Sequence, residues 1–520
     1  MRWLLAAFLA AVALSLPFTN VPVIDDWAYA FSVEELLSSG RFRILDYSCR
    51  YNLAQVLWGS LFSLPSGFSF VALRLSTVAL LIPGLLAFHD LLRRRTSESV
   101  ALWTTALLAF NPVFFRLSLS FMTDVPLIAS VAIAFWLFER GIRLERASWR
   151  VAGMLVAVAA YLVRELAIVA PAALLCAALV RDPRSKPATI GALALLAAAG
   201  FALEFWWISS VQGSTTGLAL RTGGLRYVLD VPPSLYVGAL LRMLLTTAAF
   251  AAPLALASLR RNDWGWVIAV GGSVAIAALL ADAVPFGRSE VLSPLGLGMS
   301  RALLPGEAQL ASVGQLMRAF ALAAGAASLA LLARELIELA RRGWKRCEAL
   351  DAMWMAFGVG AAGALLVLWL WQDRYDLVLL PSALWLAALR VQRLSWNRPG
   401  LQVAVACFAL LGVLGTRDDF ELNRAAWRAE AALREAGVAA ADIDGGYVLN
   451  GWRLYAHVER FAPSFPAERV PFLFAKDELP YVLSTTQLEA SEVVREYEWS
   501  RTWLSEPRLF ALRRAATSRR

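Results

Sequence analysis

Four short polar motifs, separated by long apolar stretches, hold the residues that could do chemistry. The first is Asp25-Asp26, which directly follows an apolar segment. Adjacent carboxylates repel each other, which raises the pKa of one of them unless a cation or metal lies nearby. Such a pair could act as a general base or ligate a divalent ion. The alternative is a helix N-cap, in which Asp accepts hydrogen bonds from free backbone N–H groups.

The second motif is Met122-Thr123-Asp124-Val125-Pro126. Asp124 stands at the start of an apolar helix, and proline is tolerated in the first turn of a helix. Capping can again explain the acid by itself. A catalytic role for Asp124 requires the first and third apolar segments to pack together, so that Asp124 faces Asp25.

The third motif, Arg164-Glu165, interrupts an otherwise apolar run over residues 151–180. A charge deep in lipid costs about 2.5–3.5 kcal/mol on insertion scales, so an intramembrane Arg is a functional candidate. Its guanidinium group could bind a phosphate through two parallel hydrogen bonds. The alternative is an Arg–Glu pair that holds two helix ends together.

The fourth motif is Asp373-Arg374-Tyr375-Asp376, a charged turn that is soon followed by Pro381. Arg374 offers a second phosphate-binding cation, and Tyr375 is suited to the membrane interface. A plain polar turn between two helices is the alternative.

Three further residues are candidates for substrate contacts. Tyr29 belongs to an aromatic segment just after the acidic pair, while Arg288 and Arg301 lie in a loop rich in Gly and Pro. The two arginines could line an opening for an anionic head group, or they could simply be solvated loop residues.

The composition predicts a protein that crosses the membrane many times. Of the 520 residues, 59% are hydrophobic and 17% are charged, whereas a soluble protein carries about 25% charge. The mean hydropathy is +0.58. Four scattered cysteines and two histidines give no pattern for a disulfide framework or a histidine metal centre. The net charge of +9 resides in Arg clusters between apolar blocks, a pattern that argues against nucleic-acid binding.

These Arg clusters fix the expected topology, because cytoplasmic loops are rich in Lys and Arg. The clusters lie at residues 93–95, 140–150, 181–186, 260–261, 341–346 and 390–398. If all of the clusters are cytoplasmic, an even number of spans lies between any two neighbouring clusters. Residues 151–180, which lie between two clusters, must therefore form two short helices that meet near Arg164. The predicted spans are 3–19, 68–92, 98–115, 125–139, two within 151–180, 188–208, 235–258, 264–283, 313–339, 351–371, 377–389 and 400–416.

This gives an all-α polytopic fold with about 13 transmembrane helices and a cytoplasmic N-terminus. All four polar motifs then fall on the outer boundary of the membrane. Residues 1–416 form the membrane domain, and residues 417–520 form a small extracytoplasmic α/β domain. In that domain we expect an exposed helix over 417–437 and strands near 481–483 and 509–512.

Taken together, the motifs resemble those of the GT-C membrane glycosyltransferases. Asp25-Asp26-Trp27-Ala28-Tyr29-Ala30 is similar to their acidic motif after the first span, and Phe121-Met122-Thr123-Asp124-Val125-Pro126-Leu127 to their second-loop motif. Asp373-Arg374-Tyr375 with Leu379-Leu380-Pro381 is similar to an Arg-Tyr…Leu-Pro element after a late span. The resemblance covers roughly residues 1–390. It is closest to the family 39-like group, which includes protein mannosyltransferases and lipid A aminoarabinose transferases.

The resemblance implies a role for each matching residue. Asp25 would be the catalytic base, Asp26 stands where relatives often have Glu, and Asp124 would be a supporting acid. Arg164 would bind the phosphate of the lipid carrier, and Arg374 would assist it. Some family members use a divalent metal; Asp25, Asp26 and Asp124 would be its ligands here if one is bound.

The implied reaction transfers a sugar from a polyprenyl-phosphate donor to a lipid, glycan or protein acceptor, with inversion at the sugar carbon. The expected location is a bacterial cell membrane. The alternative is a transporter or flippase of a lipid-linked sugar. Transporters usually place polar groups near the membrane midplane between repeated halves, whereas these motifs gather at one boundary.

Overall fold

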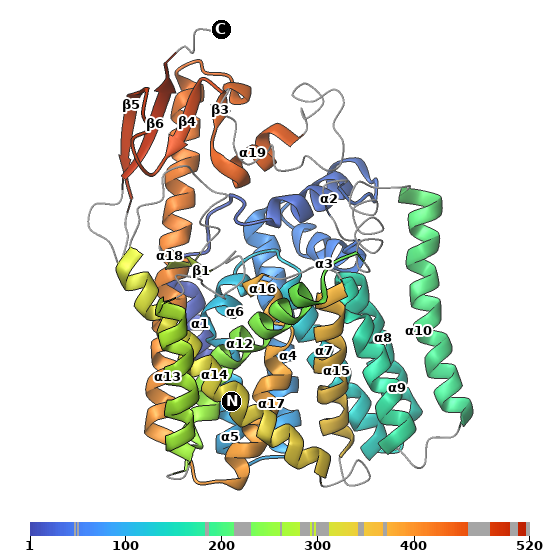
Figure 1. Ribbon diagram of the computed structural model, residues 1–520. Coiled ribbons are helices and arrows are strands. Elements are labelled where there is room, and N and C mark those ends of the chain that lie inside the picture. The colour runs from blue at the N-terminus through green and yellow to red at the C-terminus, as the bar shows by residue number, and fades with distance from the viewer. Residues whose placement is uncertain are drawn as a thin grey trace.

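The computed structural model describes most of the chain (Figure 1). The described residues are 1–45, 48, 51–181, 187–212, 230–260, 263–280, 292–293, 296–297, 311–341, 348–367, 372–455, 479–499 and 508–515. Arg288 and Arg301 lie outside these ranges.

Helices make up the membrane part. The first group is α1 (Arg2–Leu14), α2 (Asp26–Ser39), α3 (Leu53–Ser63), α4 (Phe70–Arg93), α5 (Glu98–Ala109), α6 (Pro112–Ser118), α7 (Asp124–Arg143), α8 (Ala147–Val163), α9 (Val169–Arg181) and α10 (Pro187–Trp207). The second group is α12 (Pro233–Ala257), α13 (Trp264–Leu280), α14 (Ala311–Arg341), α15 (Ala349–Val367), α16 (Asp373–Asp376), α17 (Leu380–Arg393) and α18 (Arg398–Glu435).

Among the described residues, seven helices are long and apolar enough to cross a membrane, or eight if α5 and α6 are taken as one bent span. The seven are α4, α7, α10, α12, α14, α15 and α18. This confirms the predicted helical membrane class. The predicted total of about 13 is larger because it also includes shorter apolar helices, such as α1, α8 and α9, which fall below this length.

The predicted basic clusters and Asp124 lie at opposite ends of the bundle. The ion pair Arg94–Glu139 joins the end of α4 to that of α7, and Arg95 pairs with Asp351 at the start of α15. Asp124 lies at the opposite end of α7. The predicted basic clusters around Arg94 and Arg140 therefore gather at one end, and the acidic motif lies at the other.

Residues 151–180 form two helices, as the charge pattern predicted. Helix α8 ends at Val163, Arg164 adopts an extended backbone (φ −162°, ψ 131°), and a single 3-10 turn at Glu165–Ile168 leads into α9. The helices pack against each other. Arg164 consequently lies at the same end of the bundle as Asp124.

The predicted span over 98–115 is sharply bent. Helix α5 stops at Ala109, and α6 starts at Pro112 with a bend of 65° between them. Asn111 caps the new helix, because its side chain accepts a hydrogen bond from the N–H of Phe114 (3.1 Å), and Pro112 occupies the first turn. Every residue of α6 is buried, so the bend takes Arg116 into the protein interior.

The predicted change from span to exposed helix at residue 417 is wrong. Helix α18 continues from Arg398 to Glu435, and Asp418 and Asp419 are buried. Up to Phe420 its buried apolar residues belong to the main core, whereas from Ala425 onward they belong to a second core. One helix thus serves both parts of the chain.

The second core includes a small sheet on the far end of α18 (Figure 1). Its strands are β3 (Ile443–Asp444), β4 (Tyr481–Ser484), β5 (Ser491–Glu498) and β6 (Arg508–Arg514), in the order β3-β4-β6-β5. Strands β4 and β6 are the two that the sequence predicted. Two further short strands, β1 (Leu292–Ser293) and β2 (Gly296–Leu297), pair elsewhere.

Helix α19 (Gly446–Leu454) docks this C-terminal part onto α2. The fully buried ring of Trp27 meets those of Tyr447 and Tyr455, with centroids 5.7 and 5.8 Å away. Aromatic contacts of this kind contribute about 0.5–1.5 kcal/mol each beyond the buried area. The C-terminal part therefore rests on the helix that follows the acidic pair.

A glycine sets the spacing between α4 and α7. A Cβ atom on Gly84 would lie 2.7 Å from Cα of Ala129, and this backbone atom cannot move without moving the helix. We expect Gly84→Ala to lower the thermal unfolding midpoint in detergent, since overpacking costs about 1–3 kcal/mol. Gly191→Ala on α10 is the control, because a Cβ there has nothing within 4 Å. Equal midpoints for both variants would contradict the close helix contact.

Candidate active site

Asp25 lies against Arg374. One carboxylate oxygen of Asp25 is 2.7 Å from a terminal guanidinium nitrogen of Arg374, although 349 residues of chain separate the two (374 − 25). Asp25 occupies the N-cap position of α2, but its side chain makes no capping hydrogen bond. The capping alternative therefore does not account for this carboxylate.

Asp124 forms an ion pair with Arg164. Both side chains are almost completely buried, and a buried charge is tolerated only when an opposite charge or hydrogen bonds compensate it. The neighbouring Glu165 accepts a hydrogen bond from the N–H of Tyr51 (3.3 Å). The end of α8 is thus joined both to the start of α7 and to the loop before α3.

Tyr375 connects these two ion pairs. The guanidinium carbons of Arg164 and Arg374 lie 4.5 and 4.8 Å from the centre of its ring, and Arg374 donates a hydrogen bond to its hydroxyl (2.8 Å). The result is a continuous row of side chains from Asp25 through Arg374, Tyr375 and Arg164 to Asp124, which we call the charged row. It brings together one residue or more from each of the four motifs.

The members of the charged row differ in accessibility. The side chain of Asp25 is 14% exposed, whereas those of Arg374, Asp124 and Arg164 are 5%, 3% and 2% exposed. Asp25 is therefore the acid that an incoming hydroxyl group could reach first. The two cations lie behind it, where they can stabilise a negative charge that develops during a reaction.

Asp26 points to different partners than Asp25. It is fully buried, and one of its oxygens accepts a hydrogen bond from the N–H of Val23 (2.6 Å). Burial raises the pKa of Asp26 to about 7, and this rise is opposed by the charges of Arg74 and Arg116. The two adjacent acids of the motif therefore occupy separate electrostatic environments.

A second acid with a shifted pKa follows Arg374. Burial, reinforced by the charge of Asp373, raises the pKa of Asp376 well above its usual range, although a hydrogen bond from Thr246 opposes the shift. Thr246 is on α12. The turn at α16 is therefore fixed against α12 and is not a solvated polar turn.

Tyr29 is buried on α2. The sequence reasoning missed three other buried residues at this end of the bundle, namely Arg74, Arg116 and Asp419. A signal existed for two of them, since Arg74 lies inside an apolar span and Asn111-Pro112 marks the bend that turns Arg116 inward.

The described residues do not fit a metal centre. Within those ranges, no three His, Cys, Asp or Glu side chains gather closely enough to hold an ion. Asp25 and Asp124, two of the predicted ligands, each pair with an arginine instead. We therefore derive no catalytic step through a metal.

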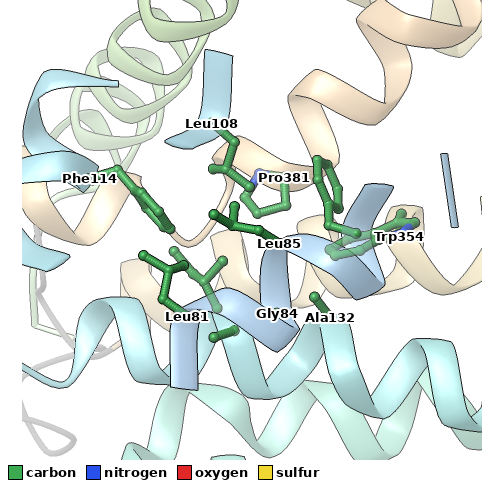
Figure 2. Close-up of a pocket in the computed structure, with 11 residues that line it drawn as sticks. Leu81, Gly84, Leu85, Leu108, Phe114, Ala132, Trp354 and Pro381 are labelled. Atoms are coloured by element: carbon green, nitrogen blue, oxygen red, sulfur yellow. The ribbon is translucent and has the colours of Figure 1, made fainter. Parts of the chain in front are cut away.

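A small apolar cavity lies in the core between α4, α5, α6, α7, α15 and α17 (Figure 2). Leu81, Phe88, Phe114, Trp354 and Pro381 are among its lining residues, and its free space is no larger than about one water molecule. An apolar cavity of this size stays empty, so it cannot accept a sugar.

A family profile described as dolichyl-phosphate-mannose-protein mannosyltransferase matches residues 56–207. This segment includes Asp124 and Arg164, and ends with α10. Over this segment, the match confirms the predicted likeness to membrane glycosyltransferases of the GT-C superfamily. Among proteins with curated descriptions, none matches the sequence.

Similar solved structures include one from each of two organisms. ArnT from Cupriavidus metallidurans bound to undecaprenyl phosphate is 14% identical, with a TM-score of 0.39, and the alignment covers 99% of this chain and 98% of that one. The oligosaccharyltransferase AglB from Archaeoglobus fulgidus, in complex with an inhibitory peptide and a dolichol-phosphate, is 13% identical, with a TM-score of 0.43 and coverage of 82% of this chain. This chain spans only 58% of the length of that AglB chain.

The raised pKa of Asp26 predicts a pH effect on stability. The folded protein holds the proton more tightly than the unfolded chain, in which the pKa is near 3.8. This stabilisation is complete below about pH 4 and is lost as the pH rises through about 7. We expect the thermal midpoint of the wild type to fall relative to that of Asp26→Asn between about pH 5 and pH 8.5.

The control is Asp442→Asn, an exposed acid in the C-terminal part, whose midpoint should keep a constant difference from the wild type over this range. If the difference in thermal midpoint between the wild type and Asp26→Asn were also constant, Asp26 would be ionised over this whole pH range.

Proposed function

We propose that this protein is an integral-membrane glycosyltransferase that moves a sugar from a polyprenyl-phosphate donor to an acceptor hydroxyl. The observation that carries the proposal is the charged row. In it, a partly exposed carboxylate pairs with one buried guanidinium group, and the ring of Tyr375 connects that group to a second one. The name of the matched family, which includes a dolichyl-phosphate-linked mannose, supports a lipid-phosphate donor.

In the proposed reaction, the acceptor oxygen attacks the anomeric carbon of the sugar and inverts it. Asp25 accepts the proton of the attacking hydroxyl, and a positioned base of this kind contributes about 10²–10⁴-fold in rate. The bond between the anomeric carbon and the phosphate oxygen breaks, and polyprenyl phosphate leaves with both bonding electrons.

Arg164 and Arg374 stabilise the departing phosphate. Each is already placed by a carboxylate and by the ring of Tyr375, so little reorganisation is needed when the negative charge develops. Guanidinium groups match phosphate oxygens through paired hydrogen bonds. Asp124 acts as the supporting acid that fixes the orientation of Arg164.

The reaction takes place at the end of the bundle opposite the basic clusters. The positive-inside rule assigns those clusters to the cytoplasm, so the proposed site faces the extracytoplasmic side of a bacterial cell membrane. In this arrangement the region after residue 416 is an extracytoplasmic α/β domain. Its contact with α2, the helix that begins beside Asp25, supports a role for this domain in receiving the acceptor.

The first test replaces the proposed base. Glycan and lipid profiling of a deletion strain identifies the product that is missing, and the wild-type gene should restore it. We expect Asp25→Asn to be expressed and folded but to reduce transfer by about 10²–10⁴-fold, because an amide cannot accept the proton. Asp442→Asn should restore the product fully. Full activity of Asp25→Asn would exclude it as the base.

The second test addresses the carrier phosphate. We expect Arg164→Gln to weaken binding of undecaprenyl phosphate to the purified protein by roughly tenfold or more, since a hydrogen bond to a charged group contributes about 1.5–3 kcal/mol. The control is Arg146→Gln, an exposed arginine just before the same helix. If the affinity of Arg164→Gln equals that of the control, then Arg164 only joins helix ends.

A further inference from the structure

Two carboxyl groups and two guanidinium groups form a buried cluster behind the charged row. Asp26, Arg74, Arg116 and Asp419 come from α2, α4, α6 and α18, and each is no more than 5% exposed. Their charges act on one another, because Arg74 and Arg116 both act on Asp26, and Asp419 acts on Arg74. We call these four residues the buried quartet.

Within the buried quartet, Asp419 is bound tightly. The Nε atom of Arg116 lies 2.7 Å from Oδ2 of Asp419, and a second guanidinium nitrogen donates to the same oxygen. The side-chain amide of Asn423 donates to the backbone carbonyl of Asp419 (2.8 Å) and to Oδ1 (3.3 Å). Helix α18 is thereby fixed to the bent helix α6.

Arg74 holds the chain that leads to Asp25. One of its terminal nitrogens donates to the carbonyl oxygens of Pro17 (3.0 Å) and Thr19, and the other donates to that of Val21. Its guanidinium group also lies 4.9 Å from the ring centre of Phe420, and that of Arg116 lies 5.0 Å from the same ring. Phe420 is the residue after Asp419.

Helix α18 also contacts the segment before Asp25 directly. Arg424 donates to the hydroxyl of Thr19 and to the carbonyl oxygen of Leu16. The segment over residues 16–24 connects α1 to Asp25 and has little regular structure of its own. Its position therefore depends in part on contacts that α18 supplies, either directly or through the buried quartet, and in part on the start of α4, where the N–H of Phe70 donates to the side chain of Asn20 (2.7 Å).

We propose that Asp419 is a positioning residue for catalysis. Through Arg116, Arg74 and Phe420, it holds the segment before Asp25 in place. Because α18 also carries the C-terminal core, the same contacts connect the position of that domain to the proposed base. Only the catalytic part of this inference rests on the proposed function. The structural connection can be measured without any transferase activity.

The negative charge of Asp419 matters because two guanidinium groups are buried beside it. Without that charge, Arg116 would be left with a weaker partner, and removing one member of a buried charge pair is strongly destabilising locally. Arg116 and Arg74 would then shift towards the remaining carboxyl group, that of Asp26. This shift would loosen the carbonyl contacts that hold residues 17–21.

The experiment compares Asp419→Asn with the wild type in three measurements. We expect faster amide hydrogen exchange in residues 16–26, unchanged affinity for undecaprenyl phosphate, and sugar transfer reduced at least tenfold at saturating donor. Asp419→Glu, which keeps the charge, should restore most of the transfer. Glu435→Gln, an acid-to-amide change at an exposed position on the same helix, is the matched control.

Arg424→Gln keeps the proposal testable if Asp419→Asn does not accumulate. This half-buried arginine is easier to replace, and its loss should speed exchange in residues 16–21 and lower transfer while carrier affinity is kept.

Unchanged exchange and unchanged transfer in Asp419→Asn would overturn the proposal, as would a parallel loss of carrier affinity, which indicates general disruption. If exchange rises while transfer is unchanged, the role of Asp419 is structural only. The proposed function would fail separately, through full activity of Asp25→Asn.

Discussion

Buried charge must be compensated, and this constraint shapes one whole end of the bundle. Leaving one member of a buried ion pair without its partner costs about 3–5 kcal/mol. Accordingly, the four buried arginines Arg74, Arg116, Arg164 and Arg374 each bind an acid or backbone carbonyl oxygens. Asp25 with Arg374 and Asp124 with Arg164 satisfy the requirement around Tyr375. The same contacts place both guanidinium groups within 4.8 Å of the centre of the Tyr375 ring.

The charged row and the buried quartet share the start of α2. Asp25 faces Arg374 in the charged row, whereas the next residue, Asp26, is surrounded by the charges of Arg74 and Arg116. Adjacent residues in the first turn of a helix point in different directions, so one acid can remain accessible while the other is buried. In our proposal, the acidic pair divides two tasks between neighbouring carboxyl groups, namely proton transfer by Asp25 and anchorage by Asp26.

Much of this arrangement was predictable because it follows from charge and hydropathy. The positions of the Arg clusters required a break near Arg164, and the structure has an extended residue there. The same topology also placed Asp25, Asp124 and Arg374 at a common end of the bundle. These predictions succeeded because a membrane restricts the chain to a few directions.

Other features depend on tertiary contacts that no local pattern encodes. Asp418 and Asp419 looked like the polar start of an exposed helix, but Arg116 compensates the charge of Asp419 from a helix about 300 residues away in the sequence. The bend that delivers Arg116 had a local signal in Asn111-Pro112, yet the length and apolar character of the segment outweighed it. The roles of the site residues remain proposals that the variants test.

The dry apolar cavity has a consequence for proton movement. Along α4 it lies between Arg74 and Arg94, and along α7 between Asp124 and Arg140, so it separates the two charged ends of the bundle. A proton needs a chain of water or polar groups to travel, and a space lined by Leu81, Phe88 and Trp354 provides none. This part of the core therefore offers protons no route between the two charged ends. Under the proposed mechanism, a proton accepted by Asp25 would not cross the bundle through this space.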